Sequence, residues 1–173
     1  MKDSLVALIR SDIEERVGRQ PALRDWLGHP FTLTGQATIL FRVSNAVGQR
    51  LPVLGSVIQR MNVHLTRAHI NWRAEIGPGL LLFHPNNVTI GHVVIGARAR
   101  IQQDVVIGGT GGVRYDADNV PTLGAGVFVG AGARVFGKLV VGDGARIGAN
   151  AVVTRDVPAG ATAVGVPARI IQK

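Results

Sequence analysis

Two histidines, His84 and His92, lie eight positions apart in the stretch "LLLFHPNNVTIGHVVIG", residues 80–96. An imidazole can act as a general base near neutral pH or as a metal ligand, and it can also occupy a turn where the backbone satisfies it. Cysteine is absent from the chain, so thiolate catalysis and cysteine metal sites are excluded. The role of the two imidazoles therefore depends on the elements that position them.

A metal site is the first alternative for this pair. Catalytic zinc needs three protein ligands around an open coordination position. Residues 71–173 contain only these two histidines. The sequence therefore favours acid–base chemistry over metal chemistry, and we expect no metal cofactor.

The second half of the chain repeats with a period of six. Steps of six from Leu123 meet an aliphatic residue each time, and the positions four residues later are also small or aliphatic. The first series is Leu123, Val129, Val135, Val141, Ile147 and Val153, and the second is Val127, Ala133, Leu139, Ala145, Ala151 and Val157. Upstream, Ile95, Ile101 and Ile107 keep the step, as do Ile76, Leu82 and Val88, with a one-residue slip between Val88 and Ile95.

Such a repeat predicts a parallel β-helix, in which each hexapeptide forms one short strand and one turn. Three hexapeptides make a triangular coil of roughly 18 residues, and the aliphatic positions stack inside it. The rhythm breaks at "GGTGGVRYDADNVPT", residues 108–122, which is polar and glycine-rich. We expect this segment to leave the β-helix as a loop, and loops on a rigid scaffold commonly carry binding residues.

Residues 1–70 instead show helical spacing of apolar side chains, with Asp3 or Ser4 available to begin the first helix. We expect this region to form a helical cap, to which Val57, Met61 and Leu65 contribute at four-residue steps, and we place His29 and His64 on helix surfaces. The predicted organisation is a helical region over 1–70 and a β-helix domain over 71–173 that carries the loop 108–122 and a C-terminal tail.

Charge and composition indicate which classes of binding partner the protein can have. The net charge is +8, which favours polyanionic partners such as a phosphorylated cofactor or an acidic carrier protein. The arginines form no single run and do not alternate with aromatic residues, so we expect no nucleic-acid binding. No apolar stretch is long enough to span a membrane, and the N-terminus lacks the features of a secretory signal. These features and the lack of cysteine suit a cytoplasmic protein.

The repeat resembles that of the hexapeptide acyltransferases, which fold as left-handed parallel β-helices, and within them the serine O-acetyltransferases. The residues that carry the resemblance are "IGPGLLLFHPNNVTIG", "VVIGGTGG" and "GAGVFVGAGARVFGKLVVGDGARIGANAVVTRDVPAGATAVGVPARII". They cover roughly residues 68–171. The six-residue repeat specifies only the fold, whereas the histidine-bearing coil, the GGTG segment and the "GVPARI" ending are more specific.

The resemblance implies site residues. His84 matches the family's catalytic histidine, which takes the proton from the acceptor hydroxyl so that its oxygen can attack the thioester. Gly109 and Thr110 match main-chain positions along the pantetheine arm, and Ala131 matches a residue that lines the pantetheine channel. Arg146 matches a basic position near the coenzyme phosphates, and Arg169 lies near the nucleotide. Acetyl-coenzyme A is thus the expected co-substrate.

The acceptor side departs from the family. Fifteen positions before the catalytic histidine the family has an aspartate that orients it, and this chain has His69 there. Where the family reads Gly-Glu-Thr, this chain has His92 between Gly91 and Val93. Another group, such as a backbone carbonyl or Glu75, would then have to orient His84. Candidate acceptor contacts are His69 and His92 together with the loop residues Arg114, Tyr115, Asp116, Asp118 and Asn119.

The sequence therefore predicts an acyl-coenzyme A-dependent O-acyltransferase, similar to serine O-acetyltransferases, that acts by direct transfer with His84 as general base. Because the acceptor side departs from the family, we expect an acceptor other than free serine. Alternatives are acylation of a sugar or of a carrier-bound intermediate, with an acyl carrier protein as partner, and a non-catalytic scaffold. The family also implies a homotrimer with sites between subunits.

Overall fold

The N-terminal region is helical in the computed structural model, which describes residues 3–111 and 119–171. Serine and threonine hydroxyls begin two of the helices: Ser4 Oγ accepts a hydrogen bond from the Ala7 amide at 3.2 Å, and Thr32 Oγ1 accepts one from the Gly35 amide at 3.1 Å. The elements are α1 (Leu5–Val17), α2 (Leu23–Gly28), the 3-10 helix η1 (His29–Phe31), α3 (Leu33–Gly48) and α4 (Pro52–Thr66).

The apolar stripe of helix α4 is largely exposed. The exposed fractions of Val57, Met61 and Leu65 are 48%, 49% and 58%. The buried positions of α4 are small or polar, namely Gly55, Asn62 and Thr66, and Gly55 lies against Gly48 of α3. The close approach of α3 and α4 through two glycines leaves the longer apolar side chains on the outside.

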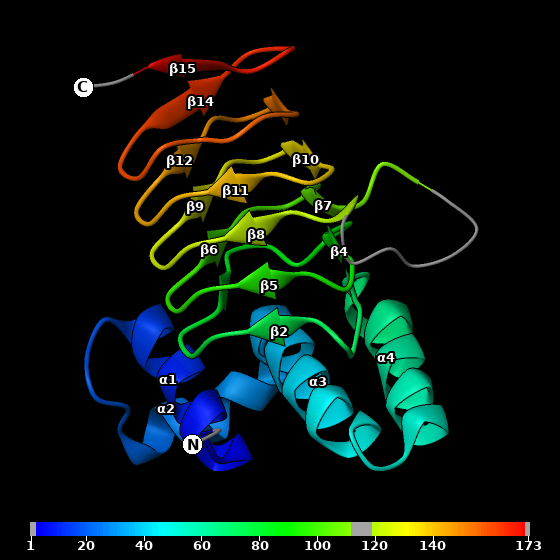
Figure 1. Ribbon diagram of the computed structural model, residues 1–173. Coiled ribbons are helices and arrows are strands. Elements are labelled where there is room, and N and C mark those ends of the chain that lie inside the picture. The colour runs from blue at the N-terminus through cyan, green and yellow to red at the C-terminus, as the bar shows by residue number, and fades with distance from the viewer. Residues whose placement is uncertain (1–2, 112–118, 172–173) are drawn as a thin grey trace.

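The repeat region forms three sheets that wind upward from the helices (Figure 1), and all their strand pairs are parallel except β14 with β15. From β1 to β10, each strand pairs with the strand three places later in the chain, as a triangular β-helix requires. Sheet A contains β1 (His69–Ile70), β4 (Thr89–Ile90), β7 (Val106–Gly108), β10 (Arg134–Phe136) and β13 (Val152–Val153). Sheet B contains β2 (Glu75–Ile76), β5 (Val94–Ile95), β8 (Thr122–Leu123) and β11 (Val140–Val141). Sheet C contains β3 (Leu81–Leu82), β6 (Arg100–Ile101), β9 (Phe128–Val129), β12 (Arg146–Ile147), β14 (Thr162–Val164) and β15 (Arg169–Ile171).

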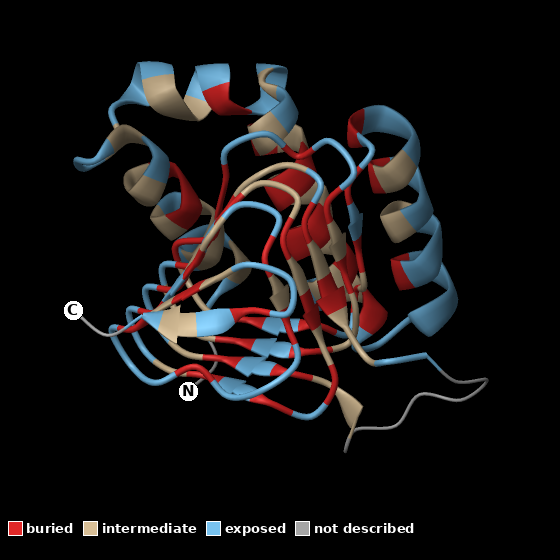
Figure 2. Ribbon diagram, turned by 90° about the horizontal axis from the view of Figure 1, so that it is seen from above, coloured by how far each residue is buried: buried red, intermediate tan, exposed pale blue. Residues whose placement is uncertain are grey.

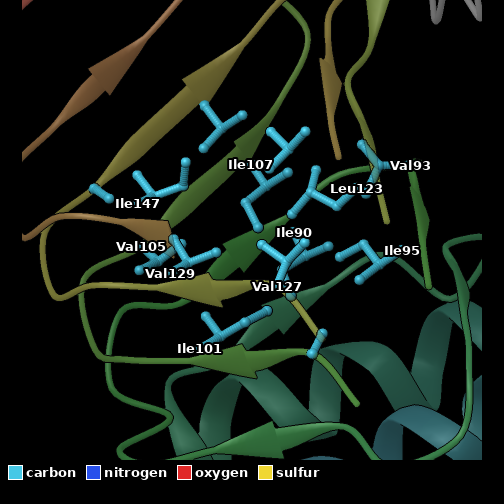
Figure 3. Close-up of a cluster of buried hydrophobic side chains, with 14 of the residues drawn as sticks. Ile90, Val93, Ile95, Ile101, Val105, Ile107, Leu123, Val127, Val129 and Ile147 are labelled. Carbon is cyan, nitrogen blue, oxygen red and sulfur yellow. The ribbon is translucent and has the colours of Figure 1, made fainter. Parts of the chain in front are cut away.

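The interior of the β-helix is filled by the two predicted aliphatic series (Figure 3). Every member of the two series that start at Leu123 and Val127 is at most 3% exposed. Seen from above, buried and exposed positions alternate along the strands of the coils (Figure 2). The predicted β-helix with N-terminal helices is thus confirmed.

The one-residue slip in the repeat consists of two irregular steps. Ile70 pairs with Ile90 across sheet A, so Ile90 and not Val88 continues the inward strand series, and the placement of Val88 was wrong. The step from Leu82 to Ile90 is eight residues and the step from Ile90 to Ile95 is five. The two irregular steps add to a net shift of one residue, and each histidine of the opening motif lies inside one of them.

The base of the β-helix is bonded to the helices through a buried ion pair. Arg42 of α3 contacts Asp12 of α1 at 2.9 Å, and both side chains are at most 3% exposed. The Arg42 guanidinium also donates to the carbonyls of Ile76 and Gly77, while Asp12 accepts from the Leu80 amide. Burial raises the pKa of Asp12, whereas the hydrogen bonds from Arg42 and Leu80 act to lower it.

A histidine expected on a helix surface is part of this helical packing. His29 is 2% exposed, so its predicted surface position was wrong. Its Nδ1 lies 3.1 Å from Arg16 Nη1, and its Nε2 lies 3.4 Å from Thr38 Oγ1. Burial, and then the nearby Arg16 charge, lower the pKa of His29 to about 4, so the imidazole is neutral at pH 7.

Candidate active site

His84 belongs to a two-residue insertion at the turn from sheet C to sheet A, here called the C–A corner. The Phe83 amide donates to Ile101 O and the Gln102 amide to Val129 O, so Phe83 and Gln102 are equivalent in successive coils. The Asp104 amide donates to Asn86 O and the Gly132 amide to Gln103 O, so Asn86 is equivalent to Gln103. His84 and Pro85 therefore have no counterpart in the next coil.

This insertion explains why the His84 imidazole is accessible. The residue is exposed, and within residues 3–111 and 119–171 its ring makes no hydrogen bond or ion pair. The regular corners of the coils above leave no side chain in the equivalent place. The arrangement leaves an accessible imidazole at the surface of the β-helix, where a general base would need to be.

Small residues continue the C–A corner above His84. Ala131 stands between Gly130 and Gly132, and its carbonyl accepts a hydrogen bond from the Asn150 amide of the next coil. A Cβ atom at Gly130 would lie 2.7 Å from the Ala149 amide nitrogen. Two coils above the histidine, the surface of this corner is therefore formed by backbone and methyl groups, which suits the predicted pantetheine channel.

Aromatic and cationic side chains border this surface on sheet C. Phe83 and Phe128 meet edge to face with ring centroids 6.4 Å apart. The Arg146 guanidinium lies over the Phe128 ring, 4.6 Å from its centroid. Arg169 lies on β15 of the same sheet and lines an open cavity of about 650 Å³ with Arg155. The two predicted phosphate-binding arginines thus stand on one sheet, in coils above His84.

The loop residues emerge at a different corner, between sheets A and B, here called the A–B corner. Thr110 and Asn119 close the base of the loop: Thr110 Oγ1 donates to Asn119 Oδ1 at 3.0 Å, and Asn119 Nδ2 donates to Thr110 Oγ1 at 2.8 Å. Gly109 lies directly against Asn119 O. The other candidate acceptor contacts, Arg114, Tyr115, Asp116 and Asp118, lie outside the described residues.

His92 occupies the A–B corner one coil below the loop. Only Gly91 and His92 separate the buried residues Ile90 and Val93, which produces the five-residue step. Burial, and then the Arg73 charge, lower the pKa of His92, while Glu75 opposes the shift. Glu75 lies on β2 of sheet B, so within one chain it acts on His92 and cannot orient His84 at the C–A corner.

His69 is already engaged by the helical region. Gln59 Nε2 of α4 lies 2.9 Å from His69 Nε2, and Gln59 Oε1 accepts a hydrogen bond from the Trp72 amide. Because the Trp72 amide can only donate, the Gln59 amide group must present its nitrogen to the imidazole. His69 therefore accepts at Nε2 and carries its proton on Nδ1.

Gln103, also at the C–A corner, was not among the predicted site residues, because nothing in the sequence distinguishes it. Gln103 Oε1 is buried and has no hydrogen-bond partner among the described residues. The residue lies between the equivalent positions Asn86 and Ala131 in the stack of coils. Buried carbonyl oxygens without a partner are rare in folded proteins, so this one requires an explanation.

The predicted residues therefore separate into two groups within one chain. His84 and Ala131 lie at the C–A corner, with Arg146 and Arg169 on the adjoining sheet C. Gly109, Thr110, Asn119 and His92 lie at the A–B corner. A site that uses both groups requires a second copy of the chain.

Neither a metal site nor a membrane span is found in the described ranges. No three side chains of histidine, aspartate or glutamate there converge as metal ligands would. No helix among those residues has the length and apolar character needed to cross a bilayer.

The chain is similar to known proteins both in sequence and in structure. No protein-family model matches the chain. The serine acetyltransferase of Synechocystis sp. is 43% identical over 178 residues, which span 99% of this chain and 68% of that protein. The serine acetyltransferase of Synechococcus elongatus is 39% identical over 158 residues, which span 90% of this chain and 64% of that protein.

The structural comparison agrees. A solved serine acetyltransferase in complex with CoA superposes with a TM-score of 0.85 at 33% identity, over 97% of this chain and 70% of that one. The chain thus spans about two thirds of the length of its relatives. The predicted left-handed parallel β-helix is confirmed, and the chain belongs to the serine acetyltransferase family of hexapeptide-repeat acyltransferases.

Proposed function

We propose that the protein is an acetyl-coenzyme A-dependent O-acetyltransferase whose general base is His84. The observation that carries this proposal is the inserted, exposed imidazole at the foot of a surface formed by Ala131 and glycine backbone and bordered by Arg146. Relatives named serine acetyltransferases, one of them solved with CoA, support the same chemistry.

The reaction is a direct transfer. The acceptor hydroxyl oxygen attacks the thioester carbonyl carbon while the His84 imidazole takes the hydroxyl proton. The tetrahedral oxyanion then collapses, the carbon–sulfur bond breaks, and the coenzyme A thiolate leaves and takes up a proton. Backbone amides around Gly109 and Thr110 are positioned on a rigid turn and are suited to stabilise the oxyanion. No acyl-enzyme is expected, because the chain has no cysteine and residues 68–173 contain no serine.

We propose that the working unit is a homotrimer. In one chain the base lies at the C–A corner, whereas the GGTG turn and Asn119 lie at the A–B corner. A threefold arrangement places the C–A corner of one subunit against the A–B corner of the next, so that each site is built by two subunits.

The acceptor is a small hydroxyl-bearing molecule of the serine class. His69 and the half-buried His92 stand where the family resemblance implies acidic groups, so the site has less negative charge to pair with an acceptor ammonium group. We therefore keep the prediction that free serine is a poor acceptor. The deciding experiment measures free-thiol release from acetyl-coenzyme A with serine and with a panel of other alcohols, beside a binding titration with acetyl-coenzyme A. Failure to bind acetyl-coenzyme A would favour the scaffold alternative.

An acidic acyl carrier protein is a second candidate donor or acceptor. Residues 26–74 contain five arginines and not one aspartate or glutamate. Arg60 and Arg67 flank the exposed stripe of Val57, Met61 and Leu65 on α4. Such a surface suits an acidic amphipathic helix. Acyl transfer from a loaded carrier protein that is lost when Arg60 and Arg67 are replaced by glutamine would support this candidate.

A further inference from the structure

Among the residues that the structure describes, the C–A corner contains two polar groups without a hydrogen-bond partner, one on His84 and one on Gln103. The His84 ring has no hydrogen-bond partner in the described part of the chain, and Gln103 Oε1 is a buried acceptor without a donor. The two residues lie in adjacent coils at the same corner, because Asn86 and Gln103 are equivalent positions. Adjacent coils are separated by about 4.8 Å, which is within the reach of a glutamine side chain.

We propose that Gln103 is the positioning residue of His84. Its Oε1 accepts a hydrogen bond from one ring N–H of His84, which fixes the tautomer and leaves the other ring nitrogen to take the acceptor proton. The catalytic half of this inference rests on the proposed function, whereas the proposed hydrogen bond does not require bound substrate. The pairing satisfies two groups that otherwise remain unbonded.

The competing acceptors near this corner are already used. His69 faces Gln59 with Nε2 and has only a donor left on its ring. Asp104 Oδ1 accepts a hydrogen bond from Asn87 Nδ2 at 3.0 Å. Glu75 stands on sheet B. Among the described residues, Gln103 Oε1 is therefore the buried acceptor oxygen of the C–A corner that lacks a partner.

An amide orients an imidazole in a different way from a carboxylate. Both accept the ring N–H and so select one tautomer, but only the carboxylate also stabilises the imidazolium that forms during proton transfer. Gln103→Glu should therefore keep His84 oriented and move the acidic limb of the kcat profile to higher pH. Gln103→Met has similar volume and lacks the acceptor, so it should release the ring.

The test begins with the free protein labelled with 15N-histidine. We expect His84 to show one dominant tautomer in the native protein and in Gln103→Glu, and a mixture in Gln103→Met. The resonance is assigned with His84→Ala. The matched control is Gln102→Met, the neighbouring glutamine of the same turn, which should leave the tautomer unchanged. This measurement does not depend on activity, so its result stands apart from that of the acetyl-transfer assay.

Activity and stability give the second readout. Gln103→Met should lower kcat roughly tenfold to a hundredfold with little change in the KM for acetyl-coenzyme A. Its resistance to urea should change little, because the one hydrogen bond lost is to the exposed His84 ring, which water can satisfy. A structural role would instead lower stability and activity together.

Two results would overturn the assignment. One is an unchanged His84 tautomer in Gln103→Met. The other is a rise in the KM for acetyl-coenzyme A with kcat preserved, which would make Gln103 a coenzyme contact. If native protein and variants all lack acetyl-transfer activity while the tautomer responds to Gln103→Met, the positioning contact stands and the proposed function falls.

Discussion

Gln59 of α4 determines the tautomer of His69 on the first strand of the β-helix. The same amide group accepts from the Trp72 amide and donates to His69 Nε2 at 2.9 Å. The helical region therefore controls the hydrogen-bonding state of a residue that stands where serine acetyltransferases carry an acid. In the proposed site, the helices contribute to the acceptor side through this contact.

Replacing Gln59 tests both hydrogen bonds of its amide group. In Gln59→Leu the Trp72 amide loses its acceptor, and we expect a loss of about 1–2 kcal/mol in the free energy of unfolding. The His69 tautomer should become mixed at the same time, which 15N-histidine spectra would reveal. Gln49→Leu, an exposed glutamine just after α3, is the control and should change neither. An unchanged His69 spectrum in Gln59→Leu would refute the tautomer assignment.

The base itself is tested by His84→Ala. We expect the turnover rate to fall at least about a hundredfold, because the variant has no group to take the acceptor proton. Binding of coenzyme A, measured by calorimetry, should be unchanged, since the imidazole acts on the acceptor and not on the donor. His64→Ala, on the exposed face of α4, is the matched control. Near-normal turnover in His84→Ala would contradict the assignment.

The chain contains a matched pair of turns that isolates the pantetheine channel. Gly124-Ala125-Gly126 and Gly130-Ala131-Gly132 have the same sequence, and each ends on a glycine with a left-handed conformation, φ 66° and 71°. The first turns from sheet B to sheet C and the second turns at the C–A corner. The two middle alanines thus occupy turns of the same type, which makes Ala125→Leu a control for Ala131→Leu.

Ala131→Leu should raise the KM for acetyl-coenzyme A at least about tenfold, because the added side chain projects into the channel and costs binding energy of more than roughly 1.4 kcal/mol. Ala125→Leu should leave the KM unchanged. The KM of each variant is measured by steady-state kinetics, after urea unfolding has shown that the two variants have similar midpoints. An equal effect of the two substitutions would exclude a channel at the C–A corner.

Acid should destabilise the protein through His29. Its pKa is lowered to about 4 in the folded protein, so the unfolded chain binds the proton first as pH falls. The stabilisation is fully present above pH 6.5 and is lost between pH 6.5 and 4, by up to about 3 kcal/mol. His29→Gln should flatten this part of the profile in urea unfolding at several pH values. His64→Gln should not, and an equally steep profile in His29→Gln would rule out this origin.

The sequence predicted the coils well because their inward positions accept only aliphatic or small side chains. It misplaced the slip because Val88 and Ile90 are both aliphatic, so hydrophobic period alone could not choose the strand residue. Strand pairing resolves the choice and shows that the irregular steps contain His84 and His92.

Sequence patterns could not predict which side chains of different helices and strands contact one another. His29 has the flanking residues of a surface position, and only the packing of Arg16 and Thr38 around it makes it a buried residue. Gln59 and Gln103 are likewise ordinary polar residues in the sequence. Their importance arises from the orientation of α4 and from the stacking of neighbouring corners, which depend on the whole fold.

The two ends of the β-helix also bear on aggregation. An open stack of parallel strands offers unpaired backbone groups at each end, on which a second molecule could add coils and grow into a fibre. At the base, Arg42 and Asn45 of α3 occupy the carbonyls of the first coil, including those of Trp72 and Ile76. At the opposite end β15 runs antiparallel to β14, which is the wrong direction for another parallel coil. The residues that hold the helices against the first coil thus also keep the strand stack from serving as a template.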